Sequence, residues 1–157
     1  MPTVKTTYDL SGRLKSLEYP SGLTLTYTHD DVGRIVTVND GANDRVDDTW
    51  KGYLLQKREY ANGTYLTHLD DSSQQLSGYG YDSFGQVANQ RWKDSSNTLL
   101  SGWSHEYDRV GNKEYSEDLV LTTTDDELYG YDDIYRPTAR PKGRRAGMKR
   151  AALTGLA

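Results

Sequence analysis

Short runs of alternating apolar and polar residues, closed by glycine-containing turns, recur along most of the chain. In residues 23–28, Leu23, Leu25 and Tyr27 share one face and three Thr share the other. A period of two is typical of a half-buried β-strand. No segment before residue 137 has helical periodicity. The pattern predicts strands over residues 4–9, 13–19, 23–28, 34–38, 76–82, 86–94, 98–108 and 112–118.

One turn motif, Tyr-Asp-x-x-Gly, organises these runs. It begins at Tyr8, Tyr81 and Tyr107. In a further copy His29 replaces the Tyr, and a looser copy begins at Tyr131. The Asp side chain can accept a hydrogen bond from the backbone about two residues on, and Gly supplies the positive φ that reverses the chain. The length of the turn suits a hairpin with a bulge. The Tyr has an apolar body to bury and a hydroxyl that can stay in water.

We therefore predict a structural role for the recurring motif residues. They are Tyr8, Asp9, Gly12, Arg13, Asp30, Gly33, Arg34, Tyr81, Asp82, Gly85, Tyr107, Asp108, Gly111, Tyr131 and Asp132.

The segment after residue 41 is a degenerate copy of the first 41 residues. A shift of 41 residues places Tyr60-Ala61-Asn62-Gly63 on Tyr19-Pro20-Ser21-Gly22, although the turn glycine of the next motif is missing. One strand–turn–strand unit per ~20–26 residues is a solenoid-type period. A propeller with blades of ~41 residues is the rival, but the repeats suffice for only about three blades, below the usual minimum of four.

The order of these motifs resembles the Rhs/YD-repeat family. The likeness rests on Tyr8-Asp9-x-x-Gly12-Arg13-Leu14, Tyr19-Pro20-x-Gly22, Asp30-x-x-Gly33-Arg34-Ile35, and the variants at 107–113 and 131–136, and it covers residues 4–138. It implies a β-sheet ribbon that spirals into a hollow shell. Such shells enclose the C-terminal toxin of bacterial polymorphic toxins or form part of Tc toxin cocoons, and teneurin-like YD shells serve adhesion.

The family's closing plug, with an Asp-Pro-x-Gly type motif and nearby self-cleavage, has no counterpart here, because none of the four Pro follows an Asp. The repeats are also too few to close a shell. We therefore expect an all-β antiparallel meander of YD-repeat hairpins, curling as a partial, open β-shell, in a truncated fragment of a longer product. Open sheet edges of this kind invite pairing with more sheet.

The net charge of the chain changes from negative to positive at one point, after residue 136. Residues 1–136 hold 13 Lys/Arg and all 23 Asp/Glu, a net charge of −10, whereas residues 137–157 carry +6. We assign residues 1–136 to the repeat sheet and residues 137–157 to a basic, disordered tail. The basic run Arg140–Arg150 can contact anionic polymers or lipid only non-specifically, because it lacks interleaved aromatic residues.

Candidate chemistry is sparse. The chain has no Cys, no signal peptide, no apolar stretch long enough for a membrane span, and no nucleophile elbow, phosphate loop or zinc-binding helix motif. His29 and His68 occupy Tyr positions of the repeat and are expected to be strand residues, and His105 is a weak catalytic candidate. The acid pairs at 30–31, 47–48, 70–71, 125–126 and 132–133 lack EF-hand spacing. We predict no catalytic, cofactor or metal residues and no enzyme activity.

Three tryptophans remain as possible ligand-facing residues: Trp50, Trp92 and Trp103. Aromatic rings can stack on sugars, but sheets also use them as packing residues. The first hypothesis is therefore a non-catalytic shell segment of a secreted or cell-surface Rhs-type polypeptide, which encloses or presents a toxin or other C-terminal cargo. The alternative is a carbohydrate-binding adhesion module. Neither requires specific nucleic-acid binding.

Overall fold

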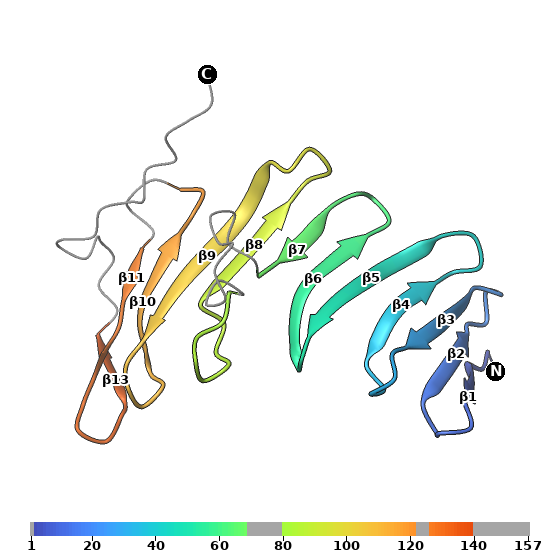
Figure 1. The fold of residues 1–157 in the computed structure, drawn as a ribbon, viewed down its shortest axis with the longest axis horizontal. Helices are drawn as coiled ribbons and strands as arrows, with labels where there is room; N and C mark the ends of the chain where they lie inside the picture. The colour runs from blue at the N-terminus through green and yellow to red at the C-terminus, as the bar shows by residue number, and fades with distance from the viewer. Residues whose placement is uncertain (1, 69–79, 122–125, 140–157) are drawn as a thin grey trace. The chain divides into compact units, whose positions relative to one another are not determined.

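The structure is a computed structural model that describes residues 2–68, 80–121 and 126–139. These residues form β-strands and turns, without a helix (Figure 1). Eleven strands make one sheet: β1 (Lys5–Tyr8), β2 (Leu14–Glu18), β3 (Thr24–His29), β4 (Ile35–Asn39), β5 (Asp44–Lys51), β6 (Leu54–Tyr60), β7 (Tyr65–Thr67), β8 (Asn89–Lys93), β9 (Leu99–Tyr107), β10 (Lys113–Asp118) and β11 (Glu127–Leu128). A second sheet consists of β12 (Gly130–Tyr131) and β13 (Pro137–Ala139).

The larger sheet is a meander in which each strand neighbours the next along the chain, from β1 to β11. The sheet is not closed, because β1 and β11 are its two ends. The predicted all-β, open antiparallel meander is confirmed. The predicted strand at 76–82 lies mostly outside the described residues, and only a single bridge from Tyr81 to Val87 is seen there.

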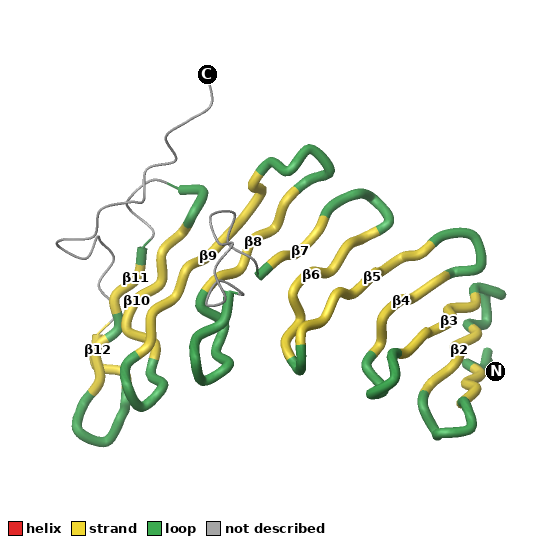
Figure 2. The backbone as a smooth tube through the Cα atoms, in the orientation of Figure 1, coloured by secondary structure: helices red, strands yellow, loops and turns green. Residues whose placement is uncertain are grey.

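The chain divides into two compact units, Met1–Leu100 and Ser101–Ala157, which we call unit 1 and unit 2. In unit 1 strands β1 to β8 follow one another in sequence order, and the turns lie alternately at one end and the other end of the strands (Figure 2). The predicted repeat region 1–136 extends across both units.

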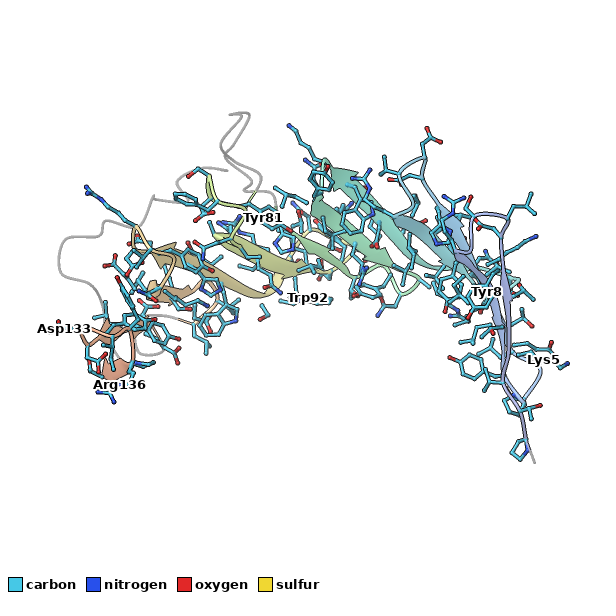
Figure 3. The ribbon with its side chains drawn as sticks, turned by 90° about the horizontal axis from the view of Figure 1, so that it is seen from below. Lys5, Tyr8, Tyr81, Trp92, Asp133 and Arg136 are labelled. Carbon is cyan, nitrogen blue, oxygen red and sulfur yellow. The ribbon has the colours of Figure 1, made fainter. Side chains whose placement is uncertain are left out.

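Cross-strand register sorts the side chains of unit 1 onto two faces. Tyr27, Val38, Val46 and Tyr60 lie opposite one another in adjacent strands. The neighbouring row, which begins with Thr28 and Thr37, points to the other face and continues with acidic residues. Side chains stand on both faces of the sheet, as Figure 3 shows. Half-buried positions predominate on the apolar face, which is the pattern of a sheet with one thin apolar side.

The last hairpin crosses the predicted boundary at Arg136. Pro137–Ala139 form β13 and pair with β12, so regular structure continues three residues beyond the change in composition. Pro is tolerated there because it begins an edge strand. The basic residues 140–157 lie outside the described residues. Within the described part of the chain, no helix is long and apolar enough to cross a membrane.

Candidate functional site

The Tyr-Asp turns share one hydrogen-bond arrangement, seen most completely at Asp9. The backbone N–H groups of Ser11 and Arg13 donate to Asp9 Oδ1 at 2.8 and 2.9 Å. The Arg13 Nε donates to Asp9 Oδ2 at 2.6 Å. Two backbone bonds, from Gly12 N–H to Asp9 O and from Asp9 N–H to Arg13 O, close the turn at 3.0 and 2.9 Å. The predicted side-chain cap is confirmed, and it satisfies two donors rather than one.

The same arrangement recurs at Asp30, Asp82, Asp108 and Asp132, where each Oδ1 accepts from the N–H groups two and four residues on. The residue four positions after the Asp varies. Where it is Arg, its guanidinium binds the second carboxylate oxygen, and at Asn112 the side-chain amide donates to Asp108 Oδ2 at 2.8 Å.

Positive φ closes these turns. Gly12, Gly33, Gly85 and Gly111 have φ between 77° and 90°. In the looser fifth copy Tyr135 takes the same place at φ 62°, a conformation that is costly for a side chain with a Cβ. The register also shifts beside several of these turns, as at Tyr8, which confirms the predicted bulged hairpins.

Sequence reasoning missed one turn of this class. Asp94 Oδ1 accepts from the N–H groups of Ser96 and Thr98, and Asn97 adopts φ 68° in the glycine position. Asn is the residue other than Gly that tolerates this region most readily. The sequence signal for this turn is therefore an Asp-x-x-Asn spacing between two predicted strands.

Hydrogen bonds from the turns lower the pKa of four motif carboxyl groups, those of Asp9, Asp30, Asp108 and Asp132. For Asp9 and Asp132 the largest cause of the lower pKa is the backbone N–H of the residue four positions on. For Asp30 and Asp108 desolvation opposes the shift, but the hydrogen bonds outweigh it and the pKa falls. These carboxylates are therefore strong acceptors that hold the turns, and poor proton donors for acid–base chemistry.

Arginines link the first turn to the second and the second to a strand. Arg13 Nη1 donates to the Asp30 carbonyl at 3.3 Å. Arg34, paired to Asp30, lies with its guanidinium carbon 5.4 Å from the centre of the Trp50 ring. Trp50 Nε1 in turn donates to Ile35 O at 2.8 Å. This series of contacts, which we call the arginine spine, connects the β1–β2 turn to β5 through side chains in addition to the hydrogen bonds of the sheet.

The later motif tyrosines reach back to preceding strands. Tyr81 Oη donates to Leu55 O, and Tyr131 Oη donates to Lys113 O, each at 2.8 Å. Both hydroxyls are therefore bound to a strand carbonyl, a partner that the sequence did not predict. Tyr8 is 60% exposed. Figure 3 labels Tyr8 and Tyr81.

Two of the three tryptophans have a ring face covered by a neighbouring side chain. Trp92 stacks on Tyr60 with ring centroids 5.6 Å apart and planes 18° apart. Trp50 lies under the Arg34 guanidinium. Trp103 is on β9 opposite Asp118, in the unit that does not contain the other two. Within unit 1, Trp50 and Trp92 therefore take part in separate contacts.

The histidines lie in separate places. His29 ends β3 opposite Ile35. His68 Nδ1 is 3.0 Å from Asn89 O, and its ring centre is 4.9 Å from that of Tyr81. Burial is the main cause of its lowered pKa. A Cβ on Gly80 would lie 1.6 Å from His68 O, so only glycine permits this close approach.

Unit 2 contains a buried polar cluster that sequence reasoning did not find. Tyr115 and Asp126 are each 4% exposed, and the Tyr115 hydroxyl donates to Asp126 Oδ2 at 2.8 Å. The Asp118 N–H donates to Asp126 Oδ1 at 3.2 Å. Burial, followed by the Asp126 hydrogen bond, raises the pKa of Tyr115. The Asp126 carboxylate therefore fastens β10 to the segment before β11.

On the other side of this strand, His105 Nδ1 is 3.0 Å from Ser116 Oγ. Burial, with a smaller effect of nearby Lys113, lowers the pKa of His105 to about 4. Ser116 is 3% exposed, so its hydroxyl is inaccessible to a substrate. The pair is a strand-to-strand contact rather than a nucleophile and base.

Asp47 and Asp48, one of the acid pairs, have different surroundings. Asp48, whose side chain is fully buried, accepts from Arg58 Nε and Nη2 at 2.7 and 2.6 Å. Burial raises the pKa of neighbouring Asp47, with further contributions from Asp44 and Glu59. Pairs 70–71 and 125–126 fall wholly or partly outside the described residues. Among the residues that the structure does describe, no three His, Cys, Asp or Glu gather as a metal-binding group.

Comparison with protein families matches residues 8–45 to the family model described as RHS Repeat. The matched segment contains the first two Asp turns and the arginine spine as far as Arg34. The predicted resemblance to Rhs/YD repeats is thus confirmed. A comparison with curated proteins found no match.

Solved structures share the fold of a much larger part of the chain than the RHS repeat. The Photorhabdus luminescens Tc holotoxin pore, mutation TccC3-D651A, matches 85% of this chain with 17% identity and a TM-score of 0.65. TcdB2-TccC3 matches 87% with 17% identity and a TM-score of 0.69, and TcdB2-TccC3 without its hypervariable C-terminal region matches 87% with 18% identity and the same TM-score. The chain spans 6–7% of the length of these neighbours.

Proposed function

We propose that this chain is a non-catalytic wall segment of a larger Rhs-type shell, and that the shell encloses or presents a toxin or other C-terminal cargo outside the producing cell. The observation that carries the proposal is the repeated Asp turn, which joins successive strands into an open sheet with little core. Such a sheet provides a large continuous surface rather than a binding cleft.

Electrostatics support a structural role for the turn residues. The motif carboxylates accept backbone N–H groups, and in three of the turns they also bind an Arg of the same turn. The pKa values of Asp9, Asp30 and Asp132 are lowered, which suits permanent acceptors. Groups committed to the backbone in this way are not available to a substrate.

Sugar binding through the tryptophans is less well supported. Trp50 and Trp92 each have a ring face occupied, by Arg34 and Tyr60 respectively. These contacts favour a packing role for Trp50 and Trp92.

Protease protection tests the wall proposal in a polypeptide that carries this sheet followed by its cargo. The intact wall should protect the cargo from added protease. Asp132→Ala removes the cap of the last described turn and should expose the cargo. Asp133→Ala changes the exposed acid next to it, which does not cap the turn, and should leave protection intact. Cargo that is cut equally fast in all three forms would contradict enclosure.

A further inference from the structure

The turn between β6 and β7 places an asparagine on the surface of unit 1. Asn62 and Gly63 are exposed, and their turn lies at one end of the strands (Figure 2). The sequence Asn62-Gly63-Thr64 matches Asn-x-Thr, which is the acceptor sequence for attachment of a sugar to an asparagine side chain. No other Asn of the chain is followed two positions later by Ser or Thr.

Backbone hydrogen bonds fix the conformation of this turn. Gly63 N–H donates to Tyr60 O, and Tyr60 N–H donates to Thr64 O, each at 2.9 Å. Gly63 has φ 80°, and a Cβ there would lie 3.0 Å from Ser95 Cβ, so glycine suits the middle position of the acceptor sequence. None of these contacts uses the Asn62 side chain.

The side chain of Asn62 is held by Thr64 through its oxygen. The Thr64 N–H donates to Asn62 Oδ1 at 3.0 Å, and the Thr64 hydroxyl donates to the same oxygen at 2.7 Å. Because a backbone N–H can only donate, the atom that it meets must be the amide oxygen. The amide nitrogen Nδ2 therefore faces away from Thr64, and no other described residue binds it.

Two other turn asparagines differ from Asn62 in this respect. Asn112 Nδ2 donates to Asp108 Oδ2, and Asn39 Nδ2 donates to Asp44 Oδ1, each at 2.8 Å. Their side-chain nitrogens are committed to carboxylates of the fold. Asn62 combines the acceptor sequence, an exposed position and an unbound Nδ2.

We propose that Asn62 is a glycosylation site, at which a sugar is attached through its C1 carbon to Nδ2. The donor is a sugar activated at C1 by a diphosphate, carried either by a nucleotide or by a lipid, and a separate transferase catalyses the step. Nδ2 forms the bond to C1, the bond from C1 to the diphosphate breaks, and the Nδ2 proton passes to a base of the transferase. The inference goes beyond the wall proposal and does not depend on the presence of cargo.

The fold can carry this modification without rearrangement. β6 ends at Tyr60 and β7 begins at Tyr65, so Asn62 lies outside both strands and takes no part in the sheet pairing. The bonds that hold the turn use Oδ1 and the backbone rather than Nδ2. The modified chain should therefore unfold in urea at the same midpoint as the unmodified chain.

Incubation of the folded, purified chain with a soluble asparagine-specific glucosyltransferase and UDP-glucose tests whether the turn accepts a sugar. The wild type should gain one hexose, and peptide mass spectrometry should locate it on Asn62. Asn62→Gln and Thr64→Val should lose the modification, whereas Thr64→Ser should retain it because the hydroxyl remains. Circular dichroism checks that each variant keeps the sheet.

Two transplanted acceptor sequences, each in the Asn62→Gln background, separate the geometry from the sequence. The double change Ser21→Asn, Leu23→Thr moves the sequence to the turn between β2 and β3, which has the same backbone hydrogen bonds and should become modified. The exposed change Glu114→Thr creates the sequence at Asn112, whose Nδ2 is bound to Asp108 and should react much more slowly.

Mass spectrometry of the chain isolated from its producing cells tests whether the site is used. Trypsin releases Asn62 within residues 59–91. A single hexose on this peptide would indicate the nucleotide-linked donor, and a larger oligosaccharide would indicate the lipid-linked donor. An unmodified Asn62 in that chain, modification in vitro only after unfolding in urea, or equal rates at Asn62 and Asn112 would overturn the proposal.

Discussion

A single aspartate organises each motif turn by accepting hydrogen bonds that the reversing backbone would otherwise leave unpaired. At Asp40 a related turn is closed by the N–H groups of Asn43 and Ala42, with Arg45 on the second oxygen. Glycine completes the motif because its missing Cβ allows positive φ, and at Gly80 because no side chain fits beside His68. Tyr135 and Asn97 show that the fold accepts other residues in this position at some cost.

Asp40 provides a pH test at the residue scale. The backbone N–H groups of Asn43 and Ala42, followed by Arg45, lower the pKa of Asp40 from 3.8 to about 2. Because the folded pKa is below the unfolded one, the contribution to stability is present above pH 3.8 and is lost as the pH falls to about 2. Titration of the Asp40 carboxyl carbon by NMR should show the low value.

Arg45→Gln separates the two causes of this shift. The Asp40 pKa should rise only part of the way towards 3.8, because the two backbone donors remain. A wild-type Asp40 that titrates near 3.8 would show that the turn does not hold its carboxylate as described.

Strand pairs fix a second class of interaction, between side chains that face each other across the sheet. Asp48 of β5 lies directly opposite Arg58 of β6, and Arg58 lies opposite Leu66 of β7, which lies opposite Trp92. This row combines the ion pair of buried Asp48 and partly exposed Arg58 with the Tyr60–Trp92 stack next to it. The middle of unit 1 is therefore held by polar as well as apolar contacts.

Arg58→Met should destabilise the sheet by about 2–3 kcal/mol, because it leaves the buried Asp48 carboxylate without its partner. Urea unfolding measures the loss. The double variant Asp48→Leu, Arg58→Met should recover most of it, since an apolar pair replaces the ion pair. Lys5→Met breaks the exposed pair with Glu18 and should cost less than about 0.5 kcal/mol. Equal losses for Arg58→Met and Lys5→Met would contradict this assignment.

The elements also show what a sequence can and cannot predict. Alternation and the Asp-x-x-Gly spacing are local signals, so the strands and bulged hairpins around Gly12 and Gly33 were predictable. The Asp48–Arg58 pair and the Arg13–Asp30 contact depend on cross-strand register over ten or more residues, which no local pattern specifies. The Asp94 turn was missed because its positive φ is carried by Asn97 rather than glycine.

The whole chain, as far as it is described, has very little interior. Tyr115 is the single buried hydrophobic residue among the described ones. Stability must therefore come mainly from contacts between neighbouring strands, as in repeat proteins whose units interact with their nearest neighbours. The mean hydropathy of −0.85 indicates a small core. Composition alone does not predict which turns carry the exposed apolar side chains.

The central claim is that the motif aspartates fold the chain into this open sheet, and a comparison of two adjacent acids tests it most directly. Asp30 caps its turn, binds Arg34 and receives Arg13 at its carbonyl, whereas Asp31 has an exposed side chain at the next position. In urea unfolding of the purified chain, Asp30→Ala should lower the midpoint markedly and Asp31→Ala should leave it near the wild-type value. Equal midpoints for the two variants would contradict the account.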